Sequence, residues 1–190
     1  GTNYPKGQLT RVRVGGATAD TNQYTFELFD AQGRVLRGTQ KLDATEYTFL
    51  QEFDAAGQLK AVVHPAPAAR RIEYAYNALG QVTEVKDGSG KVYGTGLEYA
   101  AHGAMTKVVL GNGLTERMTP NVRLQPEKIE LGETAVDDRW SLGLGYAGVT
   151  CLAGVSQANN GNVVTQTMKV GSATWVQQYG YECAGRLVES

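Results

Sequence analysis

The sequence predicts an all-β protein, an array of antiparallel β-hairpin repeats that form one continuous, curved sheet. Three observations predict it: a fixed period, alternation of apolar and polar residues, and Asn, Asp and Gly at constant turn positions. The period is marked by an aromatic residue, a Gly four residues later and an apolar residue six residues later. Four successive copies lie 24, 23 and 23 residues apart and begin at Phe29, Phe53, Tyr76 and Tyr99.

Each repeat is predicted to be a hairpin, as residues 72–85 illustrate. Ile72, Tyr74 and Tyr76 alternate with Glu73 and Ala75, which is the period of two expected for a half-buried strand rather than the 3.6 of a helix. An Asn or Asp at the first turn position can accept hydrogen bonds from the backbone that follows, and a Gly three residues later can adopt a positive φ. This combination is typical of a type I turn closed by a glycine bulge, after which the chain returns as a second strand.

The copies extend along the whole chain. A degenerate copy over residues 4–12 has a turn shortened by one residue, and a complete copy occupies residues 181–188. The copy due at residues 121–126 has lost its Gly, and the copy at residues 159–164 lacks an aromatic residue at Gln157. The turn residues predicted to be structural are Asp30, Gly33, Asp54, Gly57, Asn77, Gly80, Gly103, Gly161 and Gly185.

Aromatic residues that follow the period are expected to pack across strands. Cross-strand aromatic pairs stabilise a sheet by roughly 0.2–1 kcal/mol each, whereas a carbohydrate-binding surface would more often break the repeat than obey it. These residues are Tyr24, Phe26, Phe53, Tyr74, Tyr76, Tyr99, Tyr179 and Tyr181.

The recurring motif, an aromatic-Asp pair followed by Gly, Arg and an aliphatic residue, resembles the YD repeat of the Rhs family. The best copies are residues 29–35 and 181–187, although Asn77, Ala100 and Glu182 stand where the family has Asp. The resemblance implies a β-sheet ribbon that spirals into a hollow shell, of which this chain would be a segment. Such a shell encloses a C-terminal toxin in bacterial Rhs proteins and in the C component of Tc toxins, and a similar shell is an adhesion scaffold in teneurins. It also implies a secreted or cell-surface location, in a bacterium.

Residues 1–190 are expected to form a single YD/Rhs-repeat array that is a fragment of a longer protein, because repeats stack without a domain boundary. The chain has 18 Lys and Arg against 19 Asp and Glu, a balance that does not indicate a nucleic-acid partner. No run reaches the ~18 apolar residues of a membrane span. Cys151 and Cys183 either form a disulfide or remain buried free thiols.

Candidate catalytic and ligand-binding motifs are weak, so we expect no enzyme activity, no metal site and no cofactor. The segment Gly88–Lys91 lacks the first Gly and the final Ser or Thr of a phosphate-binding P-loop and is interpreted as a loop between hairpins. His64 and His102 have no neighbouring acid or nucleophile that suggests catalysis. The pair Asp137-Asp138 would point to opposite faces of a strand, and an exposed loop before a strand at Trp140 is preferred.

The function expected is therefore structural: a shell segment that encloses or presents a C-terminal toxin or effector. Its partners would be the remaining repeats of the parent chain and the enclosed toxin domain. The alternative is a cell-surface adhesion or carbohydrate-binding module, for which Trp140 and Trp175 are the candidate contact residues. Exposed terminal strands also predict edge-to-edge self-association.

Overall fold

The computed structural model describes residues 3–14, 22–65, 70–133, 139–146, 149–150, 156–157, 159–182 and 184–189. Cys151, Cys183 and the pair Asp137-Asp138 lie outside these residues. The described part of the chain contains β-strands and turns and no helix, which confirms the all-β prediction. Within it, accordingly, no helix has the length and apolar character needed to cross a membrane.

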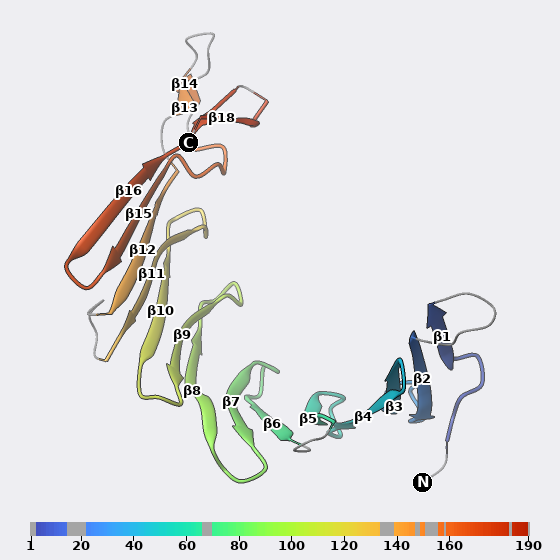
Figure 1. Cartoon of the computed structure of the whole chain (residues 1–190). Helices are drawn as coiled ribbons and strands as arrows, with labels where there is room; N and C mark the ends of the chain where they lie inside the picture. The colour runs from blue at the N-terminus through green and yellow to red at the C-terminus, as the bar shows by residue number, and fades with distance from the viewer. Residues whose placement is uncertain are drawn as a thin grey trace. The chain divides into compact units, whose positions relative to one another are not determined.

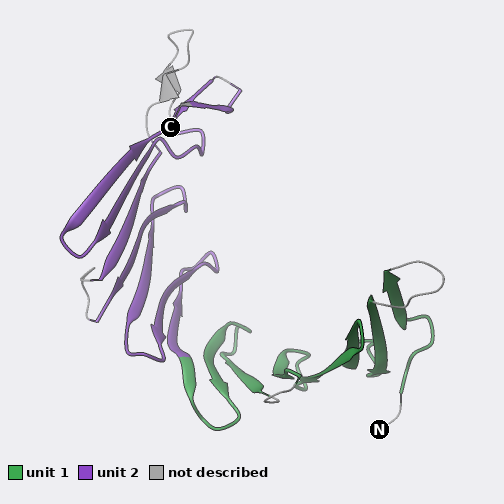
Figure 2. Ribbon diagram, in the orientation of Figure 1, with its two compact units in different colours: residues 1–93 green, residues 94–190 purple. Residues whose placement is uncertain are grey.

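The chain divides into two compact units, residues 1–93 and 94–190, coloured separately in Figure 2. Unit 1 contains β1 Arg11–Val14, β2 Asn22–Phe29, β3 Val35–Leu42, β4 Thr45–Phe53, β5 Leu59–Val63, β6 Arg71–Tyr76, β7 Val82–Asp87 and the start of β8 Val92–Tyr99. Unit 2 contains the rest of β8, β9 Met105–Leu110, β10 Thr115–Pro120, β11 Pro126–Gly132, β12 Trp140–Gly145, β13 Val149–Thr150, β14 Ser156–Gln157, β15 Thr165–Val170, β16 Ala173–Gln178, β17 Gly180–Tyr181 and β18 Leu187–Glu189.

Strands pair in the order in which they occur along the chain (Figure 1). The main sheet has 14 strands, β1 to β12 followed by β15 and β16, and its paired strands are antiparallel. Two small hairpins, β13–β14 and β17–β18, lie outside this order. The predicted array of antiparallel hairpins is therefore confirmed, and the strand expected at Trp140 is β12.

The sheet is a single layer, and this explains why so few side chains are fully buried. Among the described residues, the apolar side chains buried from solvent are Phe29, Ala61 and Val108. A globular domain buries the apolar face of its sheet against a second layer. Here no second layer covers either unit within the described residues, so most apolar side chains are half-buried against their strand neighbours.

Each unit has an apolar face and a polar face, as strand alternation requires. In unit 2 one row of directly opposed residues crosses five strands and is entirely apolar. Its members, from β10 to β16, are Met118, Ile129, Leu142, Met168 and Trp175. The adjacent row points to the other face and is largely polar or small: Thr119, Lys128, Gly143, Thr167 and Val176.

In unit 1 the apolar face includes one glycine that close packing requires. Gly38 in β3 lies between Phe26 of β2 and Phe49 of β4 in the strand register. A Cβ atom at Gly38 would stand 2.4 Å from Cζ of Phe49, closer than any real contact. The Phe49 ring therefore occupies the space that a side chain at position 38 would need.

Candidate functional site: the repeat turns and the polar face

The repeat turns share one backbone geometry. We number the turn positions 1 to 5, so that Asp30 is position 1, Gly33 is position 4 and Arg34 is position 5. The N–H of position 1 donates to the carbonyl of position 5, and the N–H of position 4 donates back to the carbonyl of position 1, a type I turn with a glycine bulge. In the first turn these distances are 3.0 Å and 3.0 Å. Turns with both bonds begin at Asp30, Asp54, Asn77, Asp87, Ala100, Leu110, Asn121 and Glu182.

Position 4 requires a positive φ. The angle is 79° at Gly33, 87° at Gly57, 79° at Gly80, 89° at Gly103 and 80° at Gly185. Gly161 also has a positive φ, of 98°, in a turn whose N–H groups bond the side chains of Asn159 and Asn160.

The Asx side chain at position 1 caps the turn. Oδ1 of Asn77 accepts hydrogen bonds from the N–H groups of Leu79 and Gln81, at 2.9 and 3.0 Å. Asp30 accepts the same two bonds, and Asp54 accepts the bond from position 5. Such side-chain bonds supply acceptors for backbone donors that the tight turn leaves without a strand partner. Ala100, which stands at position 1 of its own turn, has no side-chain acceptor to offer.

Successive turns of unit 1 stack on one another. A Cβ at Gly80 would lie 2.9 Å from Nε2 of Gln58, the position 5 residue of the preceding turn. A Cβ at Gly57 would likewise lie 3.1 Å from Nη1 of Arg34, and that guanidinium also lies 4.2 Å from the centre of the Phe53 ring. A polar side chain from one turn thus covers the bare backbone of the next.

A tyrosine hydroxyl provides a second link between neighbouring turns. The Tyr76 hydroxyl, immediately before its turn, donates to the carbonyl of Leu59 at 2.7 Å, just after the preceding turn. Tyr181 makes the same bond to Val163 at 2.8 Å, and Tyr146 makes it to Pro126 at 2.7 Å. Burial raises the pKa of Tyr76 and of Tyr146, which keeps both hydroxyls protonated as donors.

Two of these features were missed by sequence reasoning. Tyr146 is the aromatic residue that the copy at Gly161 appeared to lack, because residues 147–157, which include the β13–β14 pair, separate it from its turn. The copy at Asn121 keeps its turn without Gly, since Leu124 adopts the left-handed conformation with φ 65° and Asn121 caps it.

The opposite ends of the strands carry turns of the same type. The segment Gly88–Lys91 belongs to a turn that begins at Asp87 and joins β7 to β8, in agreement with its interpretation as a loop. Hydrogen bonds from Ser89 lower the pKa of Asp87 to about 2. Partial desolvation opposes this shift, and hydrogen bonds from the N–H of Lys91 and the hydroxyl of Tyr93 add to it. Asp87 is therefore an ionised cap and not a proton-transfer group at neutral pH.

The polar face carries ion pairs within strands and between strands. Arg71 in β6 bonds both carboxylate oxygens of Glu52 in β4, at 2.5 and 2.8 Å, and reaches Glu73 at 2.7 Å. The hydrogen bonds from Arg71 lower the pKa of Glu52. Such part-exposed pairs stabilise a protein by about 0–1 kcal/mol each. Further pairs are Glu27–Arg37, Glu84–Lys86, Glu98–Lys107 and Lys128–Glu130.

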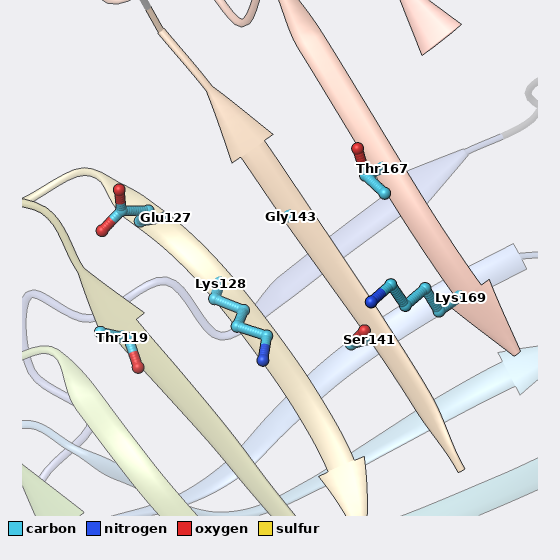
Figure 3. A pocket seen from close by; sticks show the side chains of 7 residues that line it. All are labelled: Thr119, Glu127, Lys128, Ser141, Gly143, Thr167 and Lys169. Carbon is cyan, nitrogen blue, oxygen red and sulfur yellow. The ribbon is translucent and has the colours of Figure 1, made fainter. Parts of the chain in front are cut away.

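A hollow of about 330 Å³ lies on the polar face of unit 2 (Figure 3). It forms because Ser141 and Gly143 of β12 are small while the strands on either side carry longer side chains. Ser141 is only 3% exposed. The lining combines hydroxyl, ammonium and carboxylate groups: Thr119, Glu127, Lys128, Ser141, Gly143, Thr167 and Lys169.

The predicted candidates for catalysis do not converge on this hollow. His64 is exposed after β5, and His102 is exposed at position 3 of the turn that begins at Ala100. Over the described ranges, no three His, Cys, Asp or Glu side chains gather as metal ligands would. What the arrangement offers is a repeated structural device, in which the turns and the tyrosine hydroxyls link successive hairpins and ion pairs add links within and between strands.

Comparison with known proteins agrees with this picture. The resemblance to the Rhs/YD-repeat family is confirmed by a match of residues 53–92 to the RHS Repeat family. No curated protein matches the sequence.

Solved structures share the fold of almost the whole chain. A crystal structure of TcdB2-TccC3-Cdc42 aligns with a TM-score of 0.69 and 16% identity, covering 88% of this chain and 9% of that one. A Photorhabdus luminescens Tc holotoxin pore with mutated TccC3 gives the same values. A crystal structure of TcdB2-TccC3 aligns with a TM-score of 0.68 and 16% identity over 94% of this chain and 10% of that one. The chain thus spans about a tenth of the length of the structures it resembles.

Proposed function

We propose that this chain is a segment of the wall of an Rhs/YD-repeat shell that encloses or presents a C-terminal toxin or effector. In this proposal residues 1–190 are one part of a longer secreted or cell-surface protein of a bacterium. The partners are the other repeats of the parent chain and the enclosed domain. The segment has no catalytic role, and the turn residues from Asp30 to Gly185 act by holding the wall together.

The observation that carries the proposal is the single-layer sheet whose strands follow chain order. A wall needs two accessible faces and continuous pairing, whereas an ordinary domain buries one face of its sheet. In unit 1 the stacked turns give the wall a regular margin, as position 5 of one turn covers the glycine of the next. The fold shared with Tc toxin components supports the same role.

The test is protection of the C-terminal domain by the intact parent protein. We expect that domain to resist protease at concentrations that digest it when it is produced alone. The matched control is the parent with Gly33, Gly57 and Gly80 replaced by Val, because their positive φ angles of 79°, 87° and 79° disfavour a β-branched residue and the wall should open there. Equal digestion of the domain in both proteins, or a density map of the parent without an internal cavity, would contradict containment.

A surface-binding role is the second candidate, favoured by the exposure of Trp175. This side chain is 52% exposed in β16, whereas Trp140 is half-buried in β12. A glycan-binding module would lose saturable binding on Trp175→Ala and retain most of it on Trp140→Phe. Absence of binding to a panel of cell-wall glycans would leave the wall segment as the better account.

A further inference from the structure

The hollow on the polar face of unit 2 has features that the structural role of the repeats does not require (Figure 3). Its floor is β12, where Ser141 and Gly143 follow one another along the polar face. Because Gly143 has no side chain, the floor at that point is bare backbone. A Cβ there would meet Thr167 at an ordinary 3.8 Å, so close packing does not require the glycine as it does at Gly38.

The side chain of Ser141 opens into this hollow without a partner. The residue is only 3% exposed, and no hydrogen bond within the described part of the chain engages its hydroxyl. Buried polar groups are normally hydrogen-bonded, because an unpaired one loses its bonds to water and gains none in return. An acceptor or donor on a molecule bound in the hollow would complete the bonding of this hydroxyl.

Two lysines approach the floor from opposite sides. Lys128 of β11 is opposite Gly143 in the strand register. Lys169 of β15 is opposite Ser141, and Figure 3 shows its side chain extending from β15 toward that serine. β11 and β15 lie two strand spacings apart, about 10 Å, so a group placed over β12 is within reach of both lysine side chains.

The two ammonium groups differ in how they are paired. Lys128 bonds Glu130 at 2.6 Å, whereas no carboxylate within the described ranges pairs with Lys169. The residues opposite Lys169 on either side, Ser141 and Thr174, are neutral. The hollow thus contains one ammonium group that an anionic ligand can pair with, next to an unpaired hydroxyl.

A carboxylate at the other end of the hollow restricts which anions fit. The strand register shifts after Thr119 and Lys128, so Glu127 is a bulged residue with no residue opposite it. Bulges re-aim side chains, and Glu127 lines the hollow at the end away from Lys169. It would repel a second negative charge and can accept hydrogen bonds from hydroxyl groups. Thr119 and Thr167 supply two further hydroxyls to the lining.

We propose that the hollow binds a small sugar acid, a single ring with several hydroxyls and one carboxylate. The carboxylate lies over Gly143, where it accepts hydrogen bonds from the ammonium of Lys169 and the hydroxyl of Ser141. The ring hydroxyls bond Glu127 and the threonines. A volume of about 330 Å³ is at the lower end of the roughly 300–1,000 Å³ of ligand sites, which suits one ring. The site faces away from Trp175 and does not depend on whether the parent encloses a toxin.

The test is an NMR titration of the chain with glucuronate, and glucose is the matched neutral sugar. We expect millimolar glucuronate to shift the amide signals of Ser141, Gly143 and Lys169 in a saturable way. Glucose lacks the carboxylate, acetate lacks the ring, and inorganic phosphate lacks both the ring and the single charge. Each should bind about tenfold more weakly or less, because each loses several of the hydrogen bonds.

Substitutions locate the binding. Lys169→Met should weaken glucuronate binding about tenfold or more, because it removes a charge-assisted hydrogen bond. Ser141→Ala should weaken it by a smaller factor, since it removes a neutral donor. Lys60→Met is the matched control: it removes an exposed lysine of β5 in unit 1 and should leave the dissociation constant unchanged. The Tm of each variant shows that the fold is retained.

Binding of glucose, acetate or phosphate as tightly as glucuronate would overturn the proposal, because the carboxylate or the ring would then contribute nothing. Absence of any shift would overturn it as well, since the hollow would then hold water only. An equal loss of affinity in Lys60→Met and Lys169→Met would identify non-specific attraction of anions instead of a site. None of these outcomes affects the protease protection that tests containment.

Discussion

The hydroxyl of Tyr146 donates a hydrogen bond of 2.7 Å to the carbonyl of Pro126, the same contact that Tyr76 makes to Leu59. Yet Tyr146 precedes its turn glycine, Gly161, by fifteen residues, whereas Tyr76 precedes Gly80 by four. The contact is therefore preserved across an insertion that interrupts the sequence repeat. It identifies the tyrosine bond as a part of the repeat that spacing alone does not reveal.

We expect Tyr146→Phe and Tyr76→Phe to destabilise the protein by similar amounts, about 1 kcal/mol each, because each removes one hydrogen bond to a backbone carbonyl. Urea unfolding of the two variants measures this. Tyr24→Phe is the control, since Tyr24 is 40% exposed. A cost for Tyr146→Phe no larger than that for Tyr24→Phe would contradict the structural role of the bond.

Strand glycines should differ sharply in their tolerance of a methyl group. Gly38→Ala is expected to cost about 1–3 kcal/mol, because its Cβ would overlap the Phe49 ring. Gly143→Ala is the matched control: its Cβ would meet Thr167 at an ordinary 3.8 Å, so the substitution should be neutral or stabilise by up to ~1 kcal/mol. Similar unfolding midpoints for the two variants would show that Phe49 does not occupy the site as described.

Capping by Asx can be both removed and introduced. Asn77→Ala should destabilise by about 1 kcal/mol, since the N–H groups of Leu79 and Gln81 lose their acceptor. Ala100→Asp should stabilise by a similar amount, because position 1 of that turn has no cap.

The control for the introduced cap is Ala101→Asp, which adds the same charge one residue later, where it cannot reach the same donors. Thermal denaturation of the three variants distinguishes capping from a general effect of charge. If Ala100→Asp and Ala101→Asp behaved alike, the proposed role of position 1 would be refuted.

The carboxyl of Asp87 should titrate at about 2, below its ordinary value of 3.8. A lowered pKa in the folded state means that this carboxylate stabilises the fold above about pH 4, and that the contribution disappears as the pH falls toward 2. Carboxyl titration by NMR measures the value directly.

Ser89→Ala should raise the pKa of Asp87, since the Ser89 hydrogen bonds contribute most to lowering it. Tyr93→Phe is the comparison and should raise it less, because the Tyr93 bond is longer, at 3.1 Å against 2.5 Å for the Ser89 hydroxyl. A larger shift from Tyr93→Phe would reverse this assignment.

The parts of the fold that could be predicted are those that a few neighbouring residues determine. An Asp or Asn followed three residues later by Gly determines its own turn, so Asp30–Gly33 and Asn77–Gly80 were readable in isolation. The positive φ of Leu124 could not be predicted, because a non-glycine residue adopts a positive φ only when its surroundings support the strain. Here the two hydrogen bonds that Asn121 accepts hold the turn.

The contacts between repeats were beyond sequence reasoning for a different reason. That Gln58 covers Gly80, or that Arg71 joins Glu52 to Glu73, depends on the register between strands. Register follows from pairing in space and not from the period. The apolar and polar faces, in contrast, follow directly from alternation once the strands are known.

Because most strands of the main sheet pair with the strands just before and after them in the chain, most pairing does not have to wait for a distant part of the sequence. Chains rich in local contacts fold fast, and linear arrays can nucleate at one point and propagate. Each hairpin here can add to the hairpin already formed, from the N-terminus onward. A polypeptide of this kind can assemble progressively as it emerges from a ribosome or a translocation channel, with the growing sheet edge as its own template.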